Sequence, residues 1–209
     1  MITDTIITET IQFVKEQLAG AESGHDALHA LRVHKNACEI ASQENANQLV
    51  VELAALLHDI ADAKFNDGDE EKGSAIASYY LEQKGVSDSD IAAIDYIIRN
   101  ISFRKGKGAK MTLELAIVQD ADRLDAIGAI GIARAFSYGG YKCRPFYNRE
   151  VVPGSQESHN TPNTINHFYE KLLLLKDLMN TTSGRLLAEQ RQTFLEEFLQ
   201  QFWLEVGTN

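Results

Sequence analysis

Hydrophobic residues recur at three- and four-residue steps along almost the whole chain. A first helix is predicted over residues 4–18, where apolar side chains share one face: Ile6, Ile7, Ile11, Val14 and Leu18. The same spacing predicts further helices over residues 26–42, 46–61, 70–84, 87–101, 112–136, 164–179 and 183–205. Asp26 is the expected N-cap of the second helix. Because no alternating β-branched run competes with this pattern, the sequence predicts an all-α protein.

Two stretches interrupt the helical pattern. Gly128 and Gly131 could kink or divide the helix predicted over residues 112–136. Residues 138–162 are rich in Gly, Tyr, Asn, Ser and Pro and predict a loop before the C-terminal helices. Loops of this length are usually functional or disordered, so this one could form a lid over a substrate through Tyr141, Tyr147 or His159. We expect one domain over residues 1–209 with this long inserted loop.

The most apolar of the predicted helices contains polar residues near its C-terminal end. The run Leu53-Ala54-Ala55-Leu56-Leu57 continues directly into His58 and Asp59. Burying an imidazole and a carboxylate together costs several kcal/mol unless another group pairs with them, and a divalent metal ion would do so. One helical turn further on, Asp62 shares the face of His58 and Asp59.

Two more residues of the same chemical kinds lie on predicted helices. His29 precedes His58 by 29 residues, and Asp122 interrupts another apolar helix. Two imidazoles and two carboxylates suit Mn²⁺, Fe²⁺, Co²⁺, Ni²⁺, Zn²⁺ or Mg²⁺ in octahedral or near-octahedral coordination. Four protein ligands would leave about two positions for water and substrate, and the ion would lower the pKa of a bound water and polarise a phosphoryl oxygen.

The ordered set His29, His58-Asp59, Asp122 resembles the H…HD…D signature of the HD-domain metal-dependent phosphohydrolases. The sequences of residues 24–33, 118–131 and 163–173 resemble those of a bacterial subgroup of YpgQ- and YedJ-like proteins. The resemblance implies an HD-domain helical bundle in which His29, His58, Asp59 and Asp122 bind the metal ion. It also implies hydrolysis of nucleotides by metal-activated water, with nucleoside triphosphates giving monophosphate and pyrophosphate.

The resemblance also suggests catalytic carboxylates and the number of metal ions. Related HD hydrolases carry an acid four residues after the HD histidine, usually Glu, so Asp62 could act with Asp59 to orient or deprotonate the attacking water. The alternative is that Asp62 is a surface carboxylate or a helix C-terminal residue. HD enzymes with two or more metal ions draw extra histidines from the interval between Asp59 and Asp122, which holds none here. We therefore expect one divalent ion, with Mn²⁺ the first choice, and not a cyclic-dinucleotide phosphodiesterase.

Phosphate groups need cationic partners. The stretch Arg104–Lys110 packs four basic residues among two glycines, and Lys105 and Lys107 are candidate phosphate ligands. The alternative is an ordinary solvated loop. Lys64, five residues beyond Asp59, is a second candidate.

Three further residues lie near the predicted metal ligands in the sequence. Arg32, one turn beyond His29, could face a phosphate or pair with an acid. His25, four residues before His29, could bind substrate or belong only to a loop. Asp125, one turn beyond Asp122, could lie at the mouth of the site or orient a ligand. His34 lies off the face of His29, and we expect it to be structural.

Composition limits the classes of partner. A formal net charge of −10 argues against coating nucleic acid or binding an anionic membrane, but not against a phosphorylated small molecule. No apolar run is long enough to span a bilayer and no signal peptide is evident, so we expect a cytoplasmic protein. Cys38 and Cys143 are expected to be free thiols in a reducing cytosol. The pattern leaves open whether the protein is a monomer or a homodimer.

Other functions remain open at this stage. Within the hydrolases, the alternative substrates are nucleoside monophosphates or the stringent-response alarmone. A different class is a catalytically weak nucleotide-binding regulatory module that keeps the metal ion. The presence of both Asp59 and Asp62 favours an enzyme.

Overall fold

Helices make up all of the regular secondary structure in the part of the chain that the structure describes. The computed structural model describes residues 2–20, 26–60, 71–101, 108–151, 153–155 and 162–207. These residues fall into two compact units, Met1–Asp122 and Arg123–Asn209. The all-α fold predicted from the sequence is confirmed, whereas the organisation as a single domain stays a prediction.

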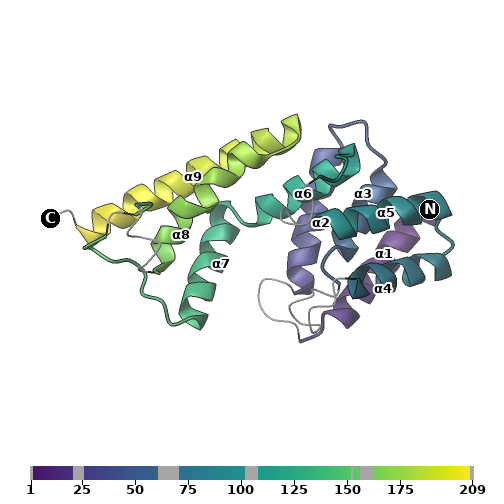
Figure 1. The fold of residues 1–209 in the computed structure, drawn as a ribbon, viewed down its shortest axis with the longest axis horizontal. Helices are drawn as coiled ribbons and strands as arrows, with labels where there is room; N and C mark the ends of the chain where they lie inside the picture. The colour runs from purple at the N-terminus through teal and green to yellow at the C-terminus, as the bar shows by residue number, and fades with distance from the viewer. Residues whose placement is uncertain are drawn as a thin grey trace. The chain divides into compact units, whose positions relative to one another are not determined.

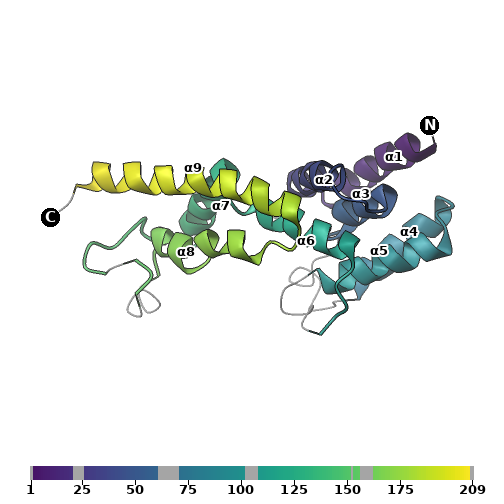
Figure 2. The ribbon, with the colours of Figure 1, turned by 90° about the horizontal axis from the view of Figure 1, so that it is seen from above.

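The first unit is a bundle built around α3. Its helices are α1 (Ile2–Gln17), α2 (Ala27–Ala41), α3 (Gln48–Leu57), α4 (Lys72–Gln83), α5 (Asp88–Asn100) and most of α6 (Leu113–Asp125). Helix α3 packs against α1, α2 and α5, while α4 packs against α5 (Figures 1 and 2). Because α3 has neighbours on several sides, the side chains from Leu53 to Leu57 are all completely buried.

Side-chain caps fix where three of these helices begin. Asp26, Asn47 and Ser87 each have extended backbone and accept a hydrogen bond from a backbone N–H three residues later. Such caps satisfy donors that the helix itself leaves unpaired, and each contributes about 1 kcal/mol. The N-cap expected at Asp26 is therefore confirmed.

Two predicted boundaries differ from the structure, and one expected division is observed. Helix α3 ends at Leu57 rather than at about residue 61. Asp62, which is predicted to share the face of His58, lies outside the described residues. The division that Gly128 and Gly131 allowed in the helix predicted over residues 112–136 is observed: it separates α6 from α7 (Gly128–Tyr141), with Gly128 at a φ of 73°. Since α7 continues to Tyr141, the loop begins about four residues later than expected.

The second unit consists of α7, α8 (Thr164–Glu170), a 3₁₀ helix η3 (Leu172–Leu178) and α9 (Thr182–Val206). The last two predicted helices correspond to these elements, with the first of them divided into α8 and η3. Helix α9 packs against α7 and η3. Figures 1 and 2 show α9 beside α7. An aromatic cluster lies between these elements, with neighbouring ring centroids 5.1–6.4 Å apart and Phe168 fully buried: Phe136, Phe146, Phe168, Phe198 and Phe202.

The segment that follows α7 is held to this unit. The backbone N–H groups of Thr164 and Ile165 donate to the carbonyls of Pro145 and Phe146 at 3.0 and 2.9 Å. Tyr147, one of the residues suggested for a lid, packs edge-on against Phe202 and Trp203. Its ring therefore belongs to the aromatic cluster of the unit. His159 lies outside the described residues.

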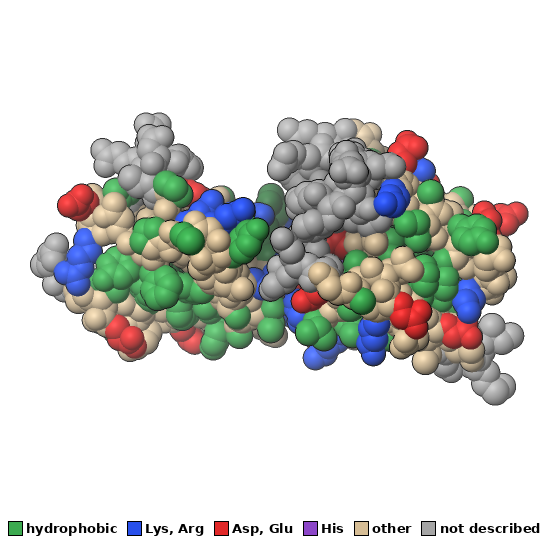
Figure 3. Space-filling model, turned by 90° about the horizontal axis from the view of Figure 1, so that it is seen from below, with side chains coloured by type: hydrophobic (Ala, Val, Ile, Leu, Met, Phe, Trp, Pro, Cys, Tyr) green, Lys and Arg blue, Asp and Glu red, His purple; other side chains and the backbone are tan. Residues whose placement is uncertain are grey.

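The second unit also leaves large hydrophobic side chains exposed. Hydrophobic side chains cover much of the part at left in Figure 3, and the exposed residues of this unit include Ile130, Tyr138, Leu174, Leu178, Leu186, Phe194 and Leu204. None of the helices described is both long and apolar enough to cross a bilayer.

Candidate metal centre

His29 lies in the first turn of α2 and is held there by the N-cap. The backbone N–H of His29 donates to Oδ1 of Asp26 at 2.8 Å, which fixes the start of the helix three residues before His29. The side chain is only 2% exposed. Its Nε2 atom lies 3.7 Å from Oδ2 of Asp59 and 3.5 Å from Oδ1 of Asp122. One imidazole nitrogen thus faces both carboxylates.

His58 presents a free nitrogen to the same point. It occupies the C-cap position of α3, where its Nδ1 lies 2.8 Å from the carbonyl oxygen of Ala55. Because a carbonyl can only accept, Nδ1 carries the proton and Nε2 keeps its lone pair. Nε2 is buried, has no hydrogen-bond partner and lies 3.8 Å from Oδ2 of Asp59. A buried, unpartnered acceptor is costly, and a metal ion would satisfy it.

The four predicted ligands converge. The ligand atoms of His29, His58 and Asp59 all lie within 4.8 Å of one another, and Asp122 approaches through its contact with His29. Two carboxylates would neutralise a divalent cation. The two imidazoles are 2% and 3% exposed, whereas Asp59 and Asp122 are 19% and 43% exposed. A ligand of the ion would therefore approach from the side of the carboxylates.

The sequence reasoning missed Asn36, which helps to position Asp122. Its side-chain amide is buried and donates to the carbonyl of Ala121 at 3.1 Å, joining α2 to α6 beside the ligand. The sequence spacing could have indicated this residue, because Asn36 lies seven residues after His29 and so shares its face of the helix. A second buried amide, Gln119, donates to the carbonyls of Asn100 and Ile101 and holds α6 to the end of α5.

The other predicted site residues fall into two groups. Five of them lie outside the described residues: His25, Asp62, Lys64, Lys105 and Lys107. Arg32 is described; it is half-buried on α2, one turn beyond His29. Its predicted contact with a phosphate stays a prediction.

Asp125 is fully buried and engaged by a cation. Its carboxylate forms an ion pair with Arg134 of α7, within the second unit. A buried carboxylate needs such a partner, and breaking the pair would leave an uncompensated charge. The ion pair gives Asp125 a structural role at the junction of α6 and α7, and its proposed contact with substrate stays a prediction.

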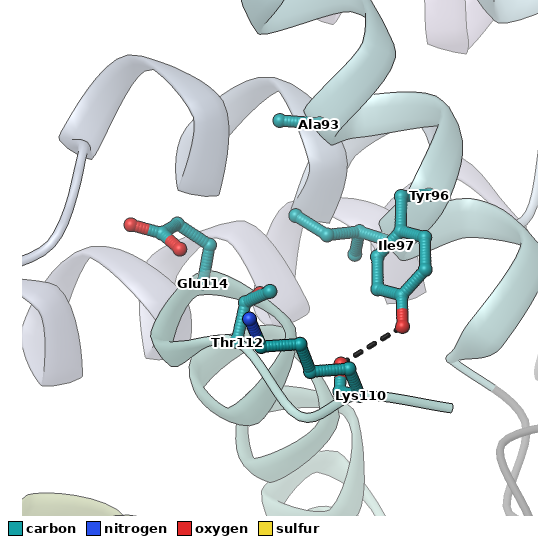
Figure 4. A pocket seen from close by; sticks show the side chains of 6 residues that line it. All are labelled: Ala93, Tyr96, Ile97, Lys110, Thr112 and Glu114. Carbon is teal, nitrogen blue, oxygen red and sulfur yellow. Dashed lines mark hydrogen bonds between the residues drawn. The ribbon is translucent and has the colours of Figure 1, made fainter. Parts of the chain in front are cut away.

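A cavity of about 310 Å³ lies elsewhere in the first unit. It is lined by residues of α5, of the segment that leads into α6 and of the first turn of α6: Ala93, Tyr96, Ile97, Lys110, Thr112 and Glu114. Figure 4 shows Tyr96 donating across it to the carbonyl of Lys110, at 2.8 Å. None of the four convergent ligands lines it, and we assign it no part in the chemistry.

Comparison with known proteins gives the family. Residues 27–127 match the HD domain, an interval that contains all four convergent ligands. The chain is also 41% identical to the protein YpgQ of Bacillus subtilis (strain 168) over 192 residues, which is 90% of this chain and 88% of YpgQ. The chain belongs to the HD-domain family. The prediction of an HD-domain relationship is thereby confirmed.

Solved structures of HD-domain relatives share the fold. An HD-superfamily hydrolase from Bacillus thuringiensis superposes with a TM-score of 0.82 at 42% identity, over 99% of this chain and all of that one. Bacillus subtilis YpgQ, solved in complex with ADP, superposes with a TM-score of 0.79 at 35% identity, over 97% and 95% of the two chains.

An HD-domain metal site of this kind should make thermal stability depend on the ion. Added Mn²⁺ at about 100 times its dissociation constant should stabilise the metal-free protein by about 2.7 kcal/mol, which raises Tm by about 5–10 °C. Differential scanning fluorimetry measures this shift. The same addition should leave the Asp122→Asn variant within about 2 °C of its metal-free Tm. An equal rise in that variant would contradict the assignment of Asp122 as a ligand.

Proposed function

We propose that this HD-domain protein is a metal-dependent phosphohydrolase that cleaves nucleoside triphosphates to monophosphate and pyrophosphate. The observation that carries the proposal is the unpartnered Nε2 of buried His58, facing the same point as His29, Asp59 and Asp122. The complex of YpgQ with ADP supports a nucleotide as the substrate class. We propose one divalent ion, with Mn²⁺ the first choice.

In this proposal, four residues of the site bind the metal ion. His29, His58, Asp59 and Asp122 would hold the metal ion. When bound, that ion would supply a Lewis acid that polarises a phosphoryl oxygen and lowers the pKa of a coordinated water. The hydrogen bond from His58 Nδ1 to Ala55 would keep the ring in the tautomer whose Nε2 is free.

The side chains around the ligands would bind the substrate. The exposed carboxylate side of the cluster leaves room for the triphosphate, and Arg32 lies one turn from His29, where it could neutralise a phosphate oxygen. We keep Asp62 as the proposed group that orients or deprotonates the attacking water, and His25, Lys64, Lys105 and Lys107 as proposed substrate contacts. These five lie outside the described residues.

The product distribution tests this proposal. The protein would be incubated with Mn²⁺ and each nucleoside triphosphate, with pyrophosphate and orthophosphate measured separately. We expect pyrophosphate and monophosphate in equal amounts, with no orthophosphate. Reactions with chelator, and with the Asp122→Asn variant, control for contaminating hydrolases. Orthophosphate as the sole inorganic product would indicate a phosphatase instead. Bound Mn²⁺ without turnover of triphosphates, monophosphates or alarmone would indicate a regulatory module.

A further inference from the structure

A second cluster of metal-binding residue types lies away from the predicted catalytic centre, between α2 and α3. His34 and Cys38 lie four residues apart on α2 and so share one face of the helix, and Glu52 faces them from α3. Nε2 of His34 is 3.0 Å from Oε2 of Glu52 and 3.5 Å from Sγ of Cys38. The three ligand atoms all lie within 4.8 Å of one another.

We propose that His34, Cys38 and Glu52 form a second metal site, selective for a thiophilic divalent ion such as Zn²⁺. Tetrahedral zinc with Zn–S near 2.3 Å and Zn–N near 2.0–2.1 Å separates its ligand atoms by about 3.3–3.6 Å. The observed separations of 3.0 and 3.5 Å are close to these values, so small rotations of the side chains would suffice. A water would complete the four ligands.

The two clusters are distinct in position and in chemistry. They share no residue, and on α2 His34 points about 140° away from His29, because each residue turns the helix by about 100°. The first cluster offers imidazoles and carboxylates only. The second adds a thiolate, which favours Zn²⁺ over Mn²⁺ or Mg²⁺. One protein could therefore bind different metals at its two sites.

Cation binding at this second site would be coupled to loss of the Cys38 proton. His34 and Glu52 are 16% and 24% exposed, and Cys38 is half-buried. Burial and the neighbouring Glu52 carboxylate raise the pKa of the Cys38 thiol to about 11 in the metal-free protein. A divalent ion would replace that thiol proton and balance the charges of one thiolate and one carboxylate. Binding would consequently release a proton and tighten as the pH rises.

Cobalt substitution tests the proposal, because a thiolate ligand gives Co²⁺ a near-ultraviolet charge-transfer band that imidazole and carboxylate ligands do not. Wild-type protein loaded with Co²⁺ should show this band. The Cys38→Ser variant should lose it, while Cys143→Ser, which removes the exposed thiol, should keep it. No band in the wild type, or a band that survives in Cys38→Ser, would overturn the proposal.

Two further measurements test the proposal if Cys38→Ser folds poorly: the number of Zn²⁺ ions bound per chain, and the Co²⁺ affinity of Glu52→Gln. Wild-type protein dialysed against Zn²⁺ should hold one more equivalent than Cys38→Ser. Glu52→Gln keeps the thiol and the shape of the side chain, so it should retain the band but bind Co²⁺ at least ~10-fold more weakly. Unchanged Co²⁺ affinity in Glu52→Gln would refute the assignment of Glu52. Mn²⁺-supported turnover should stay within about twofold of wild type in Cys38→Ser, because the cluster shares no ligand with the catalytic centre.

Discussion

Replacing Asp59 by Asn should lower kcat/KM by at least ~1,000-fold, equivalent to about 4 kcal/mol of transition-state stabilisation. The substitution keeps the size of the side chain but removes the negative charge that faces both His29 and His58. Metal affinity should fall by more than the ~10- to 100-fold that changes to outer-shell partners cost. Steady-state assays over a range of Mn²⁺ concentrations would separate weakened metal binding from lost chemistry.

Asp88→Asn is the matched control for this substitution. Asp88 is exposed in the first turn of α5 and loses the same charge without touching the cluster. Its activity should remain within about twofold of wild type, because exposed charges contribute little. If Asp59→Asn kept a tenth or more of wild-type activity at low Mn²⁺, Asp59 would not be a ligand.

Gly131→Ala should destabilise the second unit by about 1–3 kcal/mol, lowering its Tm by roughly 4–24 °C. Gly131 is buried in the first turn of α7, and a methyl group there would overlap the carbonyl oxygen of Ala126. Because that oxygen belongs to the backbone, the segment between α6 and α7 would have to move to make room for the methyl group. Thermal denaturation followed by circular dichroism gives the change in stability.

Gly140 offers the same substitution on the same helix without the clash. A methyl group added at Gly140 has no atom within 4 Å. Since alanine favours helix over glycine, Gly140→Ala should be neutral or stabilising by up to about 1 kcal/mol. Equal destabilisation by both substitutions would show that helix context, rather than contact with Ala126, limits Gly131.

The sequence was sufficient to predict the helices and the convergence of the four ligands. Helical periodicity can be read from neighbouring residues alone. His58 and Asp59 stand out because they are polar residues that directly follow an apolar run. The end of α3 was harder to predict, because no proline or glycine follows Leu57 closely and the helical pattern runs on past it. Asp62 lies beyond this boundary and outside the described residues, so its catalytic role, which rests on the family resemblance, stays a prediction.

Contacts between distant segments were beyond the reach of sequence pattern. The buried amide of Asn36 donates to a backbone carbonyl 85 residues away in the sequence. Every residue has a backbone carbonyl, so the residue type does not reveal which one accepts. The ion pair of Asp125 with Arg134 crosses the break between α6 and α7, so it depends on how that break turns. His34 was expected to be structural because it lies off the face of His29, and its proximity to Glu52 emerged only when α2 and α3 were packed together.

The two cysteines differ enough to give the protein a built-in labelling site. Maleimides attack the thiolate, and Cys38 keeps its proton at neutral pH because its pKa is raised to about 11. Cys143, two residues beyond the end of α7, is exposed. A maleimide fluorophore should therefore react much faster with Cys143 than with Cys38 in the unmodified sequence, which would place a reporter on the second unit for following its unfolding.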